Sequence, residues 1–392
     1  MNLPNDSLNN FIFPNNAEVV WSLMIVIYPF ITGLIAGAFI VSALSHVMKI
    51  KEFEPLAKFA LIGAFCFGLF AGMPLLFHLG HPERAFNIYL TPHTTSAMSV
   101  FGYVYGSYMV VLMVEIWFVY REFFIFKANS TEGLQRWIWY MLCLGITEYH
   151  PGSREIDNKF IYVLSLVGIP WAFFLHGYVG FIFGSVKAIP WWATALQPII
   201  FLSSAVVSGM AMLLVMYSII KWRSRRLIDY VMIKKFCAIM WGVFIIDWGL
   251  EMLELVHVYY RNDFDWTQIQ PLISGPIYIS YAWMQIFLFS FIPTVILAYV
   301  VLSNVTGRIM VLLANIGAVG LILQVLFMRF NVVVGGQLIS KSGRGYVEFH
   351  WEFLGREGML TAICLLVAPF VVYYLLSKIL PILDEPATAK QG

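Results

Sequence analysis

Apolar runs long enough to cross a bilayer recur along the whole chain. A membrane-spanning α-helix needs about 20 consecutive, mostly apolar residues, and nine stretches of the sequence meet this requirement. None shows the alternation that is typical of a transmembrane β-strand, and a backbone inside hydrocarbon must satisfy its own hydrogen bonds. We therefore expect nine helices, at about residues 19–46, 56–79, 98–120, 160–184, 195–220, 236–260, 276–302, 308–332 and 357–381.

A further apolar stretch at residues 135–146 is rich in tryptophan but too short to span. It predicts a helix that lies at the membrane surface. The composition agrees, because 60% of the residues are hydrophobic and 12% are charged, whereas about 25% are charged in soluble domains. The expected fold class is therefore an all-α integral membrane protein.

The basic residues predict the orientation, since cytoplasmic loops carry an excess of Lys and Arg. Seventeen of the 24 Lys and Arg fall on one side of the nine predicted helices, and seven fall on the other. The side with the excess is expected to be cytoplasmic. This places the protein in the cytoplasmic membrane, with its N-terminus outside and its C-terminus in the cytoplasm.

Composition also disfavours several kinds of site. The four cysteines are widely spaced and form no Cys-x-x-Cys pair, so we expect neither a four-thiolate iron–sulfur cluster nor a covalently attached haem in this chain. No other metal site is apparent. No basic tract is long enough to indicate nucleic-acid binding.

The candidate reactive groups gather at the predicted outer end. Six of the eight histidines lie there, which indicates proton chemistry because imidazole titrates near neutral pH. His78 ends the second span, just before His81 and Arg84, while His176 and Tyr178 lie on the fourth span. Intramembrane polar residues are usually functional. A buried histidine could instead only bond a neighbouring helix, and the loop histidines could simply be solvated.

The sixth span carries ionisable side chains on one face, which is costly in lipid. At successive spacings of 4, 3 and 3 residues, they are Asp247, Glu251, Glu254 and His257. One interpretation is a proton path from mid-membrane to the outer end, which Glu115 on the third span could continue inward. The alternative is a structural network in which Arg261 or Arg329 pairs with the carboxylates.

Together these motifs resemble the NrfD/polysulfide reductase membrane-subunit family. The run from His78 to Arg84 is similar to the family's Asp-Leu-Gly-Arg-Pro-x-Arg element, and the first span is similar in its Trp, Tyr and Gly positions. The segments that begin at His176 and at Arg329 are similar too. The second of these resembles the long branch of the family, with its DsrP, Hmc-type and HybB-like subunits.

The resemblance implies two four-helix bundles plus one added C-terminal helix. It divides the chain into an extracytoplasmic segment (1–18), a first bundle with a quinone site (19–184), a second bundle (195–332), an outer docking loop (333–356), and the added helix with a cytoplasmic tail (357–392). It also implies that the chain holds no haem.

By the same resemblance, five residues line the quinone pocket: Tyr28, His78, Arg84, His176 and Tyr178. His78 and His176 would be catalytic. His78 stands where the family usually has aspartate, and His81 stands where many relatives have arginine. The chemistry fits, because oxidation of a quinol needs a base, a hydrogen-bond donor and an apolar approach for the tail.

The expected function is that of a membrane subunit in a respiratory complex, in which the isolated chain carries out half a reaction. It would exchange electrons between menaquinol, or a similar quinone, and an extracytoplasmic multi-cluster ferredoxin-like iron–sulfur subunit. Further membrane or cytochrome subunits and a role in sulfur-compound metabolism are part of this expectation. The alternatives are an ion-coupled secondary transporter and a b-type cytochrome anchor, for which His78, His176 and His257 are the candidate haem ligands.

Overall fold

The computed structural model describes residues 18–383, except residues 49, 51–52 and 344. The predicted N-terminal segment before Glu18 and the tail beyond residue 383 lie outside the described residues. Within the described part the chain is all-helical, and its only β-type pairings are two isolated bridges, Glu18 with Glu348 and Ile339 with Tyr346. The predicted fold class is confirmed.

The long helices follow the apolar runs closely. They are α1 (Leu23–Met48), α2 (Glu54–Ala71) with its continuation α3 (Met73–His78), α5 (Ala97–Ser130), α7 (Pro151–Gly184), α8 (Gln197–Arg223), α9 (Tyr230–Arg261), the π-helix η4 (Ile279–Phe291) continued by α11 (Ile292–Leu302), α12 (Gly307–Phe330) continued by the π-helix η5 (Asn331–Gly335), and α14 (Met359–Ile379). Short helices connect them: η3 (Pro82–Arg84), α4 (Asn87–Leu90), α6 (Gly133–Leu142), α10 (Phe264–Ser274) and α13 (Gly336–Leu338).

Eight helices in the described part are long and apolar enough to cross a membrane. The helix α5 is not among them, although its 34 residues are about 50 Å long at 1.5 Å per residue. Counting α5, the number agrees with the nine predicted spans. The stretch predicted to lie at the surface forms the ten-residue helix α6.

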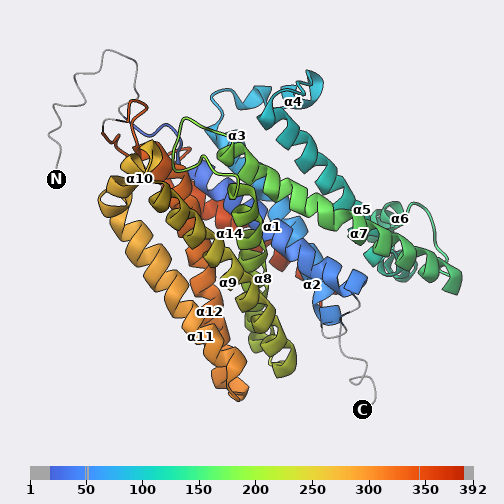
Figure 1. Cartoon of the computed structure of the whole chain (residues 1–392). Helices are drawn as coiled ribbons and strands as arrows, with labels where there is room; N and C mark the ends of the chain where they lie inside the picture. The colour runs from blue at the N-terminus through green and yellow to red at the C-terminus, as the bar shows by residue number, and fades with distance from the viewer. Residues whose placement is uncertain (1–17, 49, 51–52, 344, 384–392) are drawn as a thin grey trace.

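The helix α1 lies at the centre of the molecule (Figure 1). It packs most extensively on α2, α7 and α8, and it also contacts α12 and α14. On one side α7 packs against α5, while on the other α8 packs against α9 and α12. The added helix α14 packs mainly on α2.

Small residues permit the closest contact between α1 and α8. A side chain at Gly37 would collide with the backbone of Ala205 and Gly209, and a side chain at Gly209 would collide with Gly37. At Gly33, a methyl group would lie 3.3 Å from Cε1 of the His176 ring. Gly33 and Gly37 thus form a G-x-x-x-G contact surface on α1, which also makes room for a polar side chain of α7.

The two π-helices are joined by side chains. Asn331 of η5 donates from Nδ2 to the carbonyl of Ser280 (3.1 Å) and to Oε1 of Gln285 (2.8 Å). The Ser280 hydroxyl donates back to Asn331 Oδ1 at 2.7 Å. Such i→i+5 segments are rare and occur often at functional sites. Here the two π-helices bring together the polar side chains of Ser280, Gln285 and Asn331.

The connection after α12 begins later than the sequence suggests. Residues 333–338 are helical, and Val333 and Val334 are buried. The non-helical connection occupies residues 339–358 and is called the 339–358 loop below. It ends directly at α14, beside the C-terminal end of α3.

Candidate functional site

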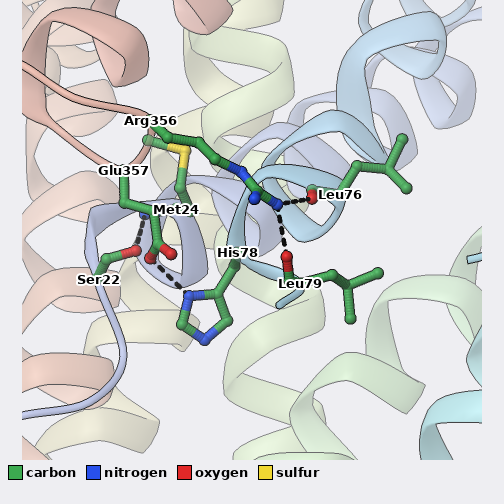
Figure 2. Close-up of polar contacts among 7 residues, drawn as sticks. All are labelled: Ser22, Met24, Leu76, His78, Leu79, Arg356 and Glu357. Carbon is green, nitrogen blue, oxygen red and sulfur yellow. Dashed lines mark hydrogen bonds and ion pairs between the residues drawn. The ribbon is translucent and has the colours of Figure 1, made fainter. Parts of the chain in front are cut away.

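His78 is the last residue of α3 and meets a residue that shortly precedes α14. Its Nδ1 lies 2.7 Å from Oε2 of Glu357, which is 279 positions away in the sequence. Both side chains are partly accessible, at 22% for His78 and 31% for Glu357. Figure 2 shows this pair beside Ser22 and Met24 at the start of α1. The predicted base therefore has a carboxylate partner.

The other residues predicted to line the pocket lie in different surroundings. Arg84 is exposed on η3, and its nearest ion-pair partner is its neighbour Glu83, at 4.0 Å. Tyr178 is half-buried on α7 among phenylalanine rings. Tyr28 is 2% exposed on α1 and packs edge-on against Phe101. No recorded hydrogen bond among the described residues joins these three to His78.

His176 is completely buried and is bound by an equally buried arginine. Nη2 of Arg329 donates to Nε2 of His176 at 3.0 Å, to the Ser204 hydroxyl at 2.7 Å and to the carbonyl of Phe201 at 3.1 Å. The guanidinium also lies over the Phe201 ring, 3.6 Å from its centroid. This cluster joins α7, α8 and α12 in the interior of the molecule.

The arginine determines which tautomer of His176 is present. A guanidinium has no acceptor, so Nε2 must receive its hydrogen bond and the ring proton must be on Nδ1. Nδ1 faces the hydroxyl of Thr32 at 3.4 Å. Both ring nitrogens are therefore occupied, and His176 acts as a buried acceptor for Arg329 in this arrangement.

The carboxylates of α9 extend from this core toward a cavity. Asp247 is fully buried, and its Oδ1 accepts from the Ser203 hydroxyl at 2.5 Å. One turn later Glu251 accepts from Gln285 (2.9 Å) and from Gln324 (3.1 Å). Both carboxylates act electrostatically on Arg329, but no ion pair within 4.0 Å joins Arg329 to either of them among the described residues.

The cavity has a volume of about 80 Å³ and is lined by the connection between α7 and α8 and by α8, α9, α10, η4 and the α12–η5 junction. Glu251 and Glu254 both line it, together with Gln285 and Asn331. The indole N–H of Trp191, another lining residue, is buried without an acceptor among the described residues. A cavity of this size that is lined by two carboxylates and an unpaired donor can hold ordered water.

Two members of the predicted proton path lie apart from this cavity. Glu115 is fully buried between α5 and α7, where the Ser165 hydroxyl donates to its Oε1 at 2.6 Å. His257 is exposed on α9 and does not line the cavity. The structure therefore brings together Asp247, Glu251 and Glu254 but does not join the other two to them.

Several polar residues at these sites were not among the predicted site residues. They are Ser203, Gln285, Gln324, Arg329, Asn331 and Glu357. Four of them interrupt the apolar runs of the seventh and eighth spans, and a polar residue within a span is by itself a functional signal. The pairing of Glu357 with His78 leaves no comparable signal, because the two residues are far apart in sequence.

Comparison with known proteins places this arrangement in a family. The family described as "Polysulphide reductase, NrfD" matches residues 13–341. The chain belongs to the NrfD family. The predicted resemblance is thereby confirmed over most of the sequence, and the protein is a multi-pass membrane protein.

Three relatives of this NrfD-family chain are informative. A selenate reductase subunit of Mesobacillus selenatarsenatis is 41% identical over 50% of this chain and 48% of its own length. Protein NrfD of Escherichia coli is 28% identical over 52% and 61%. The Hdr-like menaquinol oxidoreductase integral membrane subunit of Archaeoglobus fulgidus is 23% identical over 50% and 41%. The matches span less than two thirds of each of these relatives.

Proposed function

We propose that this NrfD-family protein is the quinone-interacting membrane subunit of a respiratory reductase complex. The observation that carries the proposal is the family match over residues 13–341. It is supported by relatives whose names denote a reductase subunit and the membrane subunit of a menaquinol oxidoreductase. Menaquinol or a similar quinol is the proposed electron donor, or the corresponding quinone is the acceptor.

The quinone ring is proposed to bind beside His78. The Nε2 atom of this side chain has no hydrogen-bond partner among the described residues, so it is free to accept a quinol proton. Apolar side chains of α1, α3 and α14 pack together nearby, including Met24, Phe77 and Leu365, and suit an isoprenoid tail. His176 fits this role less well, because its ring is buried and both of its nitrogens are occupied.

The 339–358 loop is proposed to bind an iron–sulfur partner subunit. Trp351, Phe353 and Leu354 are each about 60% exposed there, at 62%, 59% and 66%. Exposed aromatic residues are enriched at protein interfaces. Glu357 belongs to the same loop, so the partner would bind near the proposed quinone. The charge asymmetry of the loops supports an extracytoplasmic position for this loop.

A photoreactive quinone tests the site directly. After labelling of the purified complex and mapping of the modified peptides, we expect labels on residues 73–84 and on the start of α14. Labels confined to the cavity between α8 and α9 would place the ring elsewhere. A b-type haem band in the reduced-minus-oxidised spectrum of the purified chain would favour the cytochrome alternative.

The cavity favours a second proposal, that the α9 carboxylates transfer protons. Asp247, Glu251 and Glu254 lead from the buried Arg329 cluster to a space that can hold water. The Asp247→Asn variant should change proton release per quinol, or its pH dependence, while quinone affinity stays the same. If neither changes, there is no proton path through Asp247. Substrate uptake by the purified chain in liposomes would favour the transporter alternative.

A further inference from the structure

The end of α3 and the start of α14 are held together by two adjacent residues of the 339–358 loop (Figure 2). Arg356 donates from Nη2 to the carbonyl of Leu76 at 2.8 Å and to the carbonyl of Leu79. Carbonyls in the last turn of a helix lack helical partners, so the arginine satisfies groups that would otherwise face solvent. Its neighbour Glu357 is thereby placed against His78.

The carboxylate determines the tautomer of the His78 ring. An ionised carboxylate only accepts hydrogen bonds, so at 2.7 Å the proton of a neutral ring must be on Nδ1. Nε2 then carries the lone pair and can act as a base. A carboxylate in this position also stabilises the imidazolium that forms when Nε2 takes a second proton.

A hollow beside Glu357 exposes this carboxylate to water. It has a volume of about 400 Å³, and its lining includes Glu357, Arg356, Glu352, His350 and Glu18. His350 lies 3.6 Å from Glu18 and 3.7 Å from Glu348. The charged groups that share the hollow with Glu357 are Arg356, Glu352 and His350 of the loop and Glu18 before α1.

The charged groups that follow His78 on its own segment are directed elsewhere. Nδ1 of His81 lies 2.9 Å from Oε1 of Glu83, and the two side chains are 65% and 63% exposed. Arg84 is exposed beside Glu83. This second pair has the same chemistry as His78 and Glu357, but it is open to solvent.

We propose that Glu357 is the positioning residue of a carboxylate–imidazole pair, in which it holds His78 Nε2 as the base for quinol oxidation. This proposal rests on the proposed function. The quinol O–H bond breaks and its proton moves to Nε2, which forms an imidazolium that Glu357 stabilises through the N–H at Nδ1. The Nε2 proton then passes to water, and the ring protonated on Nδ1 is restored as the base. The pair of electrons goes to the iron–sulfur partner, and the second quinol proton leaves separately.

The proposal also connects the base with the docking surface. Glu357 and Arg356 lie near the end of the same loop that exposes Trp351, Phe353 and Leu354. A partner that binds these side chains would stabilise the position of Glu357 and, through it, the orientation of His78.

The test compares Glu357→Gln with the matched control Glu83→Gln, both in the purified complex. Nitrogen-15 NMR of labelled histidine reports the tautomer, and a His78→Gln sample identifies the His78 signals. We expect the Nδ1-protonated form of His78 to predominate in the wild type and in Glu83→Gln. In Glu357→Gln we expect a mixture of tautomers. An unchanged tautomer in Glu357→Gln would overturn the proposal.

Turnover gives the second readout. Glu357→Gln should lower kcat with quinol by at least about tenfold, because general bases contribute roughly 10²–10⁴-fold, while KM and the amount of assembled complex stay near wild type. Equal kcat in Glu357→Gln and wild type would refute the pair but leave the proposed function standing. A wild-type complex with no quinol turnover would refute the proposed function, whereas the tautomer result would be unaffected.

If Glu357→Gln fails to assemble, Arg356→Gln tests the same arrangement. It keeps the carboxylate but removes its anchor on the carbonyls of Leu76 and Leu79. We expect the His78 tautomers to mix in this variant as well. A wild-type tautomer and wild-type kcat together would contradict the positioning role of the loop.

Discussion

Replacement of Arg329 by methionine should destabilise the protein strongly. The change removes the charge but keeps an unbranched side chain of similar length. In the native structure the guanidinium is completely buried and binds α7 through His176 and α8 through Phe201 and Ser204. Its loss removes a donor from all three acceptors, although the Phe201 carbonyl keeps the Ser204 hydroxyl, and it removes a cation that acts electrostatically on Asp247 and Glu251.

The magnitude follows from the contacts. Three hydrogen bonds, at about 0.6 kcal/mol each for bonds between membrane helices, contribute about 2 kcal/mol. A desolvated cation–π contact contributes about 2 kcal/mol more. The expected cost is therefore about 4 kcal/mol, which is large for a single substitution.

The assay is reversible unfolding in mixed detergent micelles, with Arg308→Met as the control. Arg308 is exposed at the start of the same helix, and such surface changes usually stay within about 0.5 kcal/mol. A His176→Phe variant and the double variant complete a thermodynamic cycle, in which the two changes should be less than additive. A cost below about 1 kcal/mol for Arg329→Met would refute the inference that this arginine anchors the three helices.

Three further predictions concern helix packing, the isolated carboxylate and topology. Gly37→Ala should lower the free energy of unfolding by about 1–3 kcal/mol, because the added methyl group would meet the backbone of Ala205. Gly63→Ala is the control and should have little effect, because its methyl group would lie 3.6 Å from its nearest neighbour. Equal costs for the two variants would contradict the close contact. Glu115→Gln should leave proton release per quinol unchanged, because the contacts of Glu115 are confined to Ser165 and the α5–α7 interface; a lower yield would return Glu115 to the proton path. A fluorescent reporter that folds only in the cytoplasm should fluoresce when fused to the C-terminus, and a dark fusion that is inserted in the membrane would contradict the predicted orientation.

The fold was largely predictable because lipid imposes a simple rule on the sequence. A span must be both long and apolar, so hydropathy alone located the helices. The helix α5 shows the limit of the rule. It is 34 residues long but is not among the eight helices that are both long and apolar enough to cross a membrane. The π-helices η4 and η5 were not predictable, because their i→i+5 pattern depends on packing and on the pairing of Asn331 with Ser280 and Gln285.

The sequence indicated several of the residues that form the site, but it did not show which of them lie together. His78 and the α9 stripe were identified because ionisable groups in or near a span are rare. The sequence could not show that Arg329 binds His176 and is also near Asp247. This depends on how α12 packs against α7, α8 and α9. Nor could it show that Glu357 would reach His78, because the position of α14 against α2 and α3 is a long-range feature.

Rapid mixing of a menaquinol analogue with the purified complex tests the central claim most directly. The rate at which the iron–sulfur clusters of the partner become reduced is measured for the wild type and for His78→Ala, with His81→Ala as the control. Wild type and His81→Ala should reduce the clusters at the same rate, whereas His78→Ala should be slower by at least about a hundredfold. Reduction in His78→Ala at the wild-type rate would contradict the account of quinol oxidation at this end of the protein.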